Sequence, residues 1–403
     1  MTAPPRTDLR LAALICGVAG LYDVAYVAAE LTRAAVLGMR IDLLYSDFLV
    51  FHAASRAFFD GRLDIVYDID ALTHLQNTLY VSHIPFELGF RPFLYPPLWL
   101  LAVLPFGLLP LKAAVALFLV LTAGAALLAL RAIGLRWPAV AAVLTAPAAV
   151  WIVLAGQNTF LSLALLYGGL TLLERRPVLA GVLLGCLAYK PQIWLLVPVA
   201  LLCAREWRAL LSLAVTVVAL SIATLLLFGA DLWFDFLQAA RHVGSGTAAA
   251  EMFERVRGHM TTIVAAAKIV GAPDGLAMGA QIAGSLAALA AVCWAFFRRP
   301  ASDERTAVLA AASVFVSPYT LNYDLLLLMP AVALLFLHPD PRGYRPGERL
   351  VYLATWLVPH FCPLLNTIEI PVTPLVVLAF GAIALVRLNS VPKVELPMTA
   401  GPR

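Results

Sequence analysis

A carboxylate placed just after the first long apolar run has the clearest capacity for chemistry. Asp47 stands in the stretch Tyr45-Ser46-Asp47-Phe48, within a polar segment that holds seven of the 24 acidic residues of the chain. A carboxylate at a membrane surface can take a proton from an attacking hydroxyl, an effect worth about 10²–10⁴-fold in rate. The alternative is a helix cap or a solvated loop acid, which Ser46 just before it supports.

Charged residues inside later apolar runs form a second group of candidates. Lys190 lies within the apolar segment 177–203. Burying an ammonium is costly, so such a lysine indicates a functional anionic partner, for which a phosphate is the natural choice. Snorkelling to the membrane surface is the alternative. Asp324, beside Tyr323 in a third apolar segment, supports the same functional interpretation.

Polar residues near likely chain turns complete the candidates. Gln157 and Asn158 follow Gly156 and could bind sugar hydroxyls or cap exposed backbone groups. Arg91 and Tyr95 stand before prolines and could border a cavity, although an interfacial aromatic is often only a membrane anchor. Basic residues of the segment 229–260 could meet a lipid phosphate or rest on headgroups. These residues are Arg241, His242, Arg255, Arg257 and His259.

The composition predicts an all-α polytopic membrane protein. The chain is 62% hydrophobic and 13% charged, with a mean hydropathy of +0.89. Soluble domains carry about 25% charged residues, and a membrane barrel would alternate apolar and polar residues instead of showing long apolar runs. The net charge of +4 comes with basic residues gathered in short connectors, which are predicted to be cytoplasmic.

Several functions are disfavoured by missing patterns. The five cysteines stand singly in apolar runs, which predicts neither a disulfide framework nor a metal site. The sequence has no Gly-rich phosphate loop and no H-E-x-x-H or G-x-S-x-G motif, which argues against nucleotide-driven transport, a metalloprotease and a serine hydrolase. No basic strip with interleaved aromatics is present, so we expect no nucleic acid partner.

The elements that would position the candidates begin with one helix near 9–36, expected to be retained rather than cleaved as a signal peptide. The segment 38–92 is predicted to be a first external loop, with an amphipathic surface helix around 47–54. The run 93–111 contains four prolines, which favours a re-entrant or short broken element over a straight span.

Three later segments, 138–173, 177–203 and 306–337, are each too long for one span and short for two. Hairpins with basic ends inside and a polar tip outside fit them, so all three tips should face the Asp47 segment. A second external loop is expected at 229–260. With spans at 209–228 and 275–297 and two helices in 349–388, about 11 or 12 crossings form one domain over 1–403.

Five short motifs occur in order along the chain: Ser46-Asp47-Phe48 with Tyr67-Asp68, Phe93-Leu94-Tyr95-Pro96-Pro97-Leu98, Gly156-Gln157-Asn158, Lys190-Pro191, and Ser317-Pro318-Tyr319 with Tyr323-Asp324. In this order they resemble the polyprenol-phosphate-mannose-dependent mannosyltransferases of glycosyltransferase family 87, in the GT-C superfamily. The late motif departs from members that carry a histidine there, because Asn322 precedes Tyr323 in this chain. Neither His52 nor His83 stands where it would obviously substitute.

The resemblance implies a GT-C type bundle that transfers a sugar, mannose by default, from a polyprenyl-phosphate donor to a lipid or glycan acceptor, with inversion. Asp47 would be the general base. Lys190 would hold the charge of the leaving phosphate, with an arginine of the second external loop as the next choice. The remaining donor- and substrate-binding candidates are Gln157, Asn158, Tyr95, Arg91, Tyr323 and Asp324.

No metal or cofactor is expected besides the donor, and the lipid bilayer is an expected partner. A bacterial inner membrane fits best, with a multi-pass chain and an active site on the periplasmic face. The main alternative is a secondary transporter or flippase, because broken helices with polar tips are also typical of transporters. A polymerase or ligase of lipid-linked glycans and a membrane scaffold are further alternatives.

Overall fold

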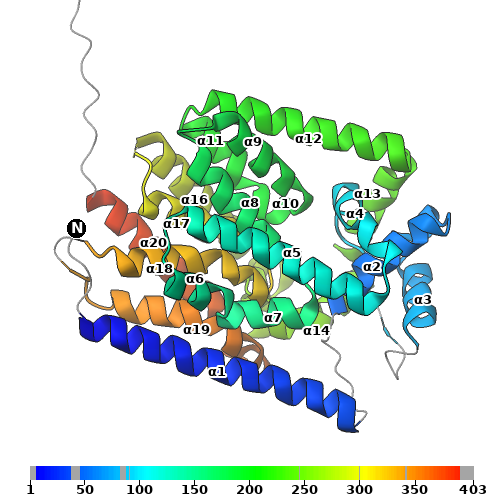
Figure 1. Cartoon of the computed structure of the whole chain (residues 1–403), viewed down its shortest axis with the longest axis horizontal. Coiled ribbons are helices and arrows are strands. Elements are labelled where there is room, and N and C mark those ends of the chain that lie inside the picture. The colour runs from blue at the N-terminus through cyan, green and yellow to red at the C-terminus, as the bar shows by residue number, and fades with distance from the viewer. Residues whose placement is uncertain are drawn as a thin grey trace, which may run out of the picture.

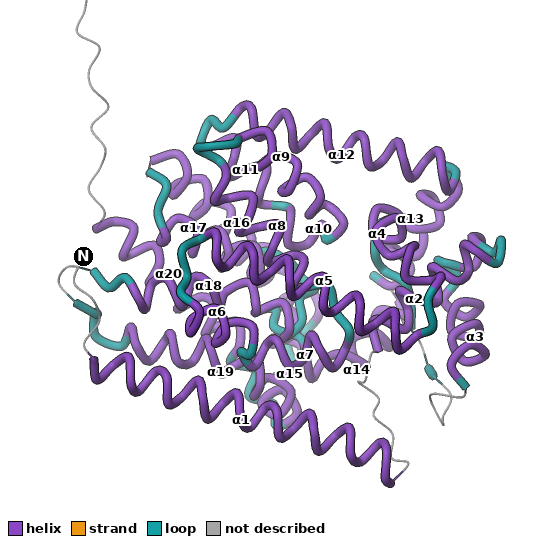
Figure 2. The backbone as a smooth tube through the Cα atoms, in the orientation of Figure 1, coloured by secondary structure: helices purple, strands orange, loops and turns teal. Residues whose placement is uncertain are grey.

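The computed structural model describes residues 6–37, 46–81, 88–89, 91–244, 246–298, 300–340 and 343–390. Over these ranges the elements are helices, without a β-strand, as Figure 2 shows. The all-α polytopic membrane fold predicted from composition is therefore confirmed. Figure 1 shows the long helices α1 (Arg6–Leu37) and α12 (Trp207–Phe228) at opposite edges of the bundle, with other helices between them.

The first segment after α1 contains α2 (Ser46–Phe59), η1 (Leu63–Ile65) and α3 (Ile69–Tyr80). The prediction of a surface helix here is wrong, because every residue of α2 from Phe48 to Ser55 is buried. This stretch is apolar on nearly all sides and packs against α3, α5 and the segment that follows. A helix that is hydrophobic all round is a core helix.

The proline-rich run folds into two short pieces, α4 (Pro97–Val103) and η2 (Leu104–Leu108). This confirms the expected short broken element. It lies close to α2, because a Cβ on Gly107 would come within 2.6 Å of the Cβ of Ser55. The Ser55 hydroxyl also donates to the Val103 carbonyl at 3.0 Å. The long apolar helix α5 (Leu111–Ala132) follows.

Each of the three polar-tipped segments is broken near its expected tip. The first contains α6 (Trp137–Leu144), α7 (Pro147–Ala155) and α8 (Thr159–Leu172). The second contains α9 (Pro177–Cys186), η3 (Leu187–Tyr189), α10 (Pro191–Trp194) and α11 (Leu196–Cys203). The third contains α17 (Asp303–Phe315), η5 (Asn322–Leu328) and α18 (Met329–Leu337). The breaks fall at Gln157, Lys190 and the residues before Asn322.

The rest of the chain follows the expected order. It contains α13 (Asp231–Val243), α14 (Gly246–Val256), η4 (Arg257–His259), α15 (Ile263–Ile269), α16 (Asp274–Arg298), α19 (Glu348–Thr367) and α20 (Thr373–Ser390). The two predicted C-terminal helices are thus present.

Four described helices, α5, α12, α16 and α20, are long and apolar enough to cross a membrane. The pair α6–α7, bent by 52°, would make a fifth span. The other apolar helices are shorter, at 10–17 residues. The expected total of about 11 or 12 crossings therefore stays a prediction.

Small residues allow a close contact between α9 and α12. A Cβ on Gly181 of α9 would lie 2.2 Å from the Ala209 carbonyl oxygen of α12. One on Gly185, four residues later, would lie 2.8 Å from Thr216. This small-xxx-small spacing lets two backbones approach in lipid, where the hydrophobic effect between helices is absent.

Candidate active site

The turn between α7 and α8 brings two distant parts of the chain together. Gly156 ends α7 with φ of 67°, in the left-handed region that glycine adopts without strain. A Cβ at this position would lie 2.5 Å from the Cβ of Phe48. Only a glycine therefore lets the first turn of α2 rest on this turn, which places Asp47 beside Gln157.

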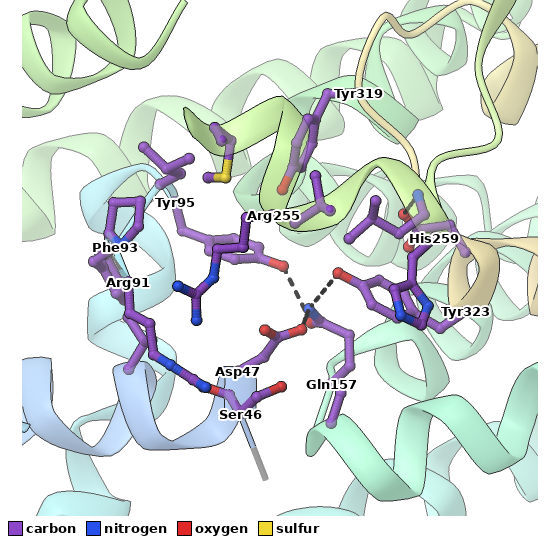
Figure 3. A pocket seen from close by; sticks show the side chains of 18 of the residues that line it. Ser46, Asp47, Arg91, Phe93, Tyr95, Gln157, Arg255, His259, Tyr319 and Tyr323 are labelled. Atoms are coloured by element: carbon purple, nitrogen blue, oxygen red, sulfur yellow. Dashed lines mark hydrogen bonds between the residues drawn. The ribbon is translucent and has the colours of Figure 1, made fainter. Parts of the chain in front are cut away.

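Asp47 lies in a hydrogen-bonded network with the residues predicted at the helix breaks (Figure 3). Gln157 Nε2 donates to Asp47 Oδ2 at 2.8 Å and to Tyr323 Oη at 3.0 Å. Gln157 Oε1 accepts from Tyr95 Oη at 3.1 Å and from the Asn158 backbone N–H at 2.7 Å. Through one glutamine, the base candidate is thus joined to the segment before α4, the turn between α7 and α8, and η5.

The surroundings of Asp47 suit a base. Burial raises the pKa of its carboxyl above the ordinary value, while Arg91 and the hydrogen bonds from Gln157 and Tyr323 oppose this rise. A carboxyl whose pKa moves toward the working pH accepts a proton more readily and still ionises. Asp47 therefore combines a part-buried position in the pocket wall with partners that hold its charged form.

Lys190 has an anionic partner within the protein, and its role toward a phosphate stays a prediction. Its Nζ lies 2.5 Å from Asp324 Oδ1, and the two side chains are 1% and 3% exposed. Asn158 Oδ1 at 3.2 Å and Thr159 Oγ1 at 3.3 Å accept further hydrogen bonds from Nζ. Asp324 Oδ2 in turn accepts from the Leu321 N–H at the start of η5. This ion pair links the second and third helix breaks.

A cavity of about 650 Å³ is lined in part by this ion pair. Of the predicted site residues, seven line it: Asp47, Arg91, Tyr95, Gln157, Lys190, Tyr323 and Asp324. Asn158 is fully buried and contributes through its bond to Lys190. The three broken tips and the start of α2 thus line one pocket. This agrees with the prediction that the three tips face the Asp47 segment.

The amino-acid sequence of the chain matches a known protein family. A sequence model of glycosyltransferase family 87 matches residues 93–318, more than half of the chain. The chain belongs to this family. No curated protein and no solved structure matches it. Membership makes the protein a membrane glycosyltransferase and favours an enzyme over a transporter or flippase. The matched range includes Tyr95, Gln157 and Lys190, whereas Asp47 and Asp324 lie beyond its two ends.

The glycosyltransferase has two arginines in the wall of its pocket. Arg91 precedes α4, and its Nη1 donates to the Ser46 carbonyl at 3.2 Å. Its own carbonyl accepts from the buried Gln76 at 3.2 Å. Arg255, near the end of α14, extends its guanidinium into the pocket above Asp47 (Figure 3). Of the basic residues predicted in 229–260, Arg255 and His259 line the pocket, whereas Arg241, His242 and Arg257 do not.

The histidines take different places in the glycosyltransferase. His52 lies outside the pocket, with Nδ1 2.7 Å from Tyr80 Oη and Nε2 2.9 Å from the Leu109 carbonyl. His83 lies outside the described residues. His259 lines the pocket beside Trp151, with ring centroids 5.0 Å apart, and burial lowers its pKa. Among the described residues, no group of three or more His, Cys, Asp and Glu could hold a metal ion.

Asn366 lies outside the pocket but supports it, and sequence reasoning missed this residue. Its Nδ2 lies 2.8, 3.1 and 2.9 Å from the carbonyl oxygens of Arg257, Gly258 and Met260, which share its two N–H donors. These bonds attach η4, which carries His259 and adjoins Arg255, to α19. The only sequence signal was a single amide in an apolar helix, which is a functional hint within a membrane.

Proposed function

We propose that this glycosyltransferase moves a sugar from a polyprenyl-phosphate donor to a hydroxyl of a lipid or glycan acceptor, with Asp47 as general base. Mannose is the first candidate sugar. The observation that carries the proposal is the part-buried Asp47 carboxylate, held by Gln157 within a pocket that two arginines also line. The pocket would face the non-cytoplasmic side of a bacterial inner membrane, where both lipid-linked substrates can reach it.

The proposed step is a direct displacement. The acceptor oxygen attacks the anomeric carbon while Asp47 takes the hydroxyl proton. The bond from the anomeric carbon to the phosphate oxygen breaks, and its electron pair leaves with the polyprenyl phosphate. Attack opposite the leaving group inverts the anomeric centre. Phosphate is a good leaving group, so the site needs to hold its charge more than to protonate it.

Arg91 and Arg255 are suited to that charge by the chemistry of their guanidinium groups. The ammonium of Lys190 is already paired with Asp324, and a second anion would have to compete with a contact of 2.5 Å. Arginine presents a planar fork of donors that matches phosphate oxygens. Cations positioned beside the leaving group stabilise the charge that develops on it. In this proposal the two arginines hold the phosphate, and the step needs no metal ion.

The test compares the native chain with Asp47→Asn in membranes supplied with synthetic polyprenyl-phosphate sugars, mannose first. Label should pass from the donor to a membrane acceptor with the native chain and fall at least about 100-fold with the variant, the lower limit for a lost general base. Asp64→Asn is the matched control, because Asp64 is an exposed acid of the same segment. Equal transfer by the native and Asp47→Asn chains would remove Asp47 from the mechanism. No transfer from any such donor would overturn the proposal.

A further inference from the structure

We propose that Gln157 is a positioning residue, which holds one oxygen of Asp47 and so aims the other at the acceptor hydroxyl. This inference rests on the proposed function, because it concerns the same base. It replaces the expectation that Gln157 binds a sugar hydroxyl. Three features of the amide carry it: its orientation, its lack of spare hydrogen-bonding capacity, and its rigid attachment.

The orientation of the Gln157 amide is determined by a backbone group. The two ends of an amide side chain are told apart by their hydrogen-bond partners. A backbone N–H can only donate, and that of Asn158 lies 2.7 Å from Oε1. The oxygen must therefore be at this end. The NH₂ group then faces Asp47 Oδ2 at 2.8 Å, where a carboxylate accepts from it.

The amide has no capacity left for a substrate. An amide oxygen accepts two hydrogen bonds, and its NH₂ group donates two. Oε1 is occupied by Tyr95 Oη and the Asn158 N–H. Nε2 is occupied by Asp47 and Tyr323 Oη. A sugar hydroxyl could bind Gln157 only by displacing one of these four partners.

The position of Gln157 makes it a firm support. Its side chain is 2% exposed, and it follows Gly156, whose close contact with α2 fixes the distance to Asp47. Figure 3 shows the Asp47 carboxylate in the centre of the pocket, between the Gln157 amide and the side of Arg255. Once Oδ2 is held, rotation of the carboxylate is blocked, so Oδ1 remains the oxygen presented to a substrate.

Two consequences follow from removing the amide. The carboxylate could rotate or tilt, and a displacement of about 1 Å can cost on the order of 10²-fold in rate. The charged form of Asp47 would also lose a donor, so the pKa of the carboxyl would rise further. The acid limb of the pH–rate profile should therefore move to higher pH, because the base must be ionised to act.

The experiment measures kcat, the KM for the donor and the pH profile of Gln157→Leu, with Gln157→Met as a second variant of similar volume. The expected result is a kcat lower by on the order of 10²-fold, a KM changed by less than about threefold, and an acid limb at higher pH. Gln192→Leu is the matched control, because Gln192 also lines the pocket. The amide that donates to Asp47 and Tyr323 belongs to Gln157 and stays in place in this variant. It should leave the pH profile unchanged.

A raised KM with an unchanged kcat and pH profile would overturn the proposal and return Gln157 to substrate binding. The same substitution in an Asp47→Asn chain gives an independent check, since residues that act as one unit are not additive. Gln157→Leu should add little further loss there, and a full additional loss would contradict the inference. Native transfer with an inactive Asp47→Asn variant establishes the base first, so these outcomes bear on Gln157 alone.

Discussion

The buried pair Lys190–Asp324 gives the sharpest test of the site. Replacing Lys190 by Met keeps an apolar stem of similar length but leaves the Asp324 carboxylate buried without its cation. Removing one partner of such a pair typically costs about 3–5 kcal/mol, because a charge is left uncompensated. At an unfolding entropy of about 2.1 cal/mol/K per residue, a loss of this size lowers Tm by roughly 5 °C in a chain of 403 residues.

The assay is thermal unfolding of purified protein in detergent, followed by double-mutant analysis. Asp324→Asn alone should also destabilise, whereas the double variant Lys190→Met/Asp324→Asn should recover most of the loss, because both charges are gone. Lys268→Met is the matched control. Lys268 lies 2.9 Å from Asp274, but the side chains are 31% and 83% exposed. An exposed pair of this kind is worth about 0–1 kcal/mol.

Two results would refute this reasoning. A Lys190→Met chain with native stability would show that the pair does not compensate a buried charge. If that chain also bound the donor much more weakly, Lys190 would be a phosphate ligand, as the sequence first suggested. Additive losses in the double variant would likewise show that Lys190 and Asp324 act separately.

Three other perturbations test neighbouring parts of the site. Gly156→Ala should lower both Tm and sugar transfer. The left-handed backbone alone costs alanine about 1–2 kcal/mol, and the added Cβ would lie 2.5 Å from the Cβ of Phe48 in α2. A variant with native stability would contradict this close contact. Arg255→Gln should raise the KM for the donor by about 10–100-fold through loss of charged hydrogen bonds. Arg241 lies outside the pocket, so Arg241→Gln should leave this KM unchanged. Equal effects of the two substitutions would exclude a specific phosphate contact by Arg255. Burial raises the pKa of Asp47 in the folded protein. The protonated carboxyl therefore stabilises the fold at pH values below the unfolded-state pKa of about 4. This stabilisation is lost as the pH rises through the pKa of Asp47 in the folded state. Asp47→Asn should therefore unfold at the same or a higher Tm than the native chain at pH 7, and a lower Tm would contradict this sign.

The convergence of the helix breaks could be predicted from the sequence. Polar residues inside apolar runs are costly in lipid, so Gln157, Lys190 and Asp324 marked the places where helices must end and polar groups must gather. The equal design of the three segments then placed these residues on one side. Their meeting in a single pocket with Asp47 follows from that topology.

Two features could not be predicted because they depend on long-range packing. The sequence around α2 is apolar enough for either a surface helix or a core helix, and only the folding of α4 and η2 over it decides between them. Lys190 and Asp324 are 134 residues apart. Local patterns showed that each charge needs a partner, but not that they are each other's partner.

The attachment of η4 to α19 has a consequence for the order in which the site is made. Asp47 is synthesised early, Gln157 follows 110 residues later, and Tyr323 another 166 residues after that. Asn366, which fastens the segment carrying His259, comes later still. At about 5–20 residues per second, roughly tens of seconds pass between the synthesis of Asp47 and that of Asn366. A chain that has only partly entered the membrane therefore carries the carboxylate without the pocket, and sugar transfer becomes possible only after nearly the last helix has been inserted.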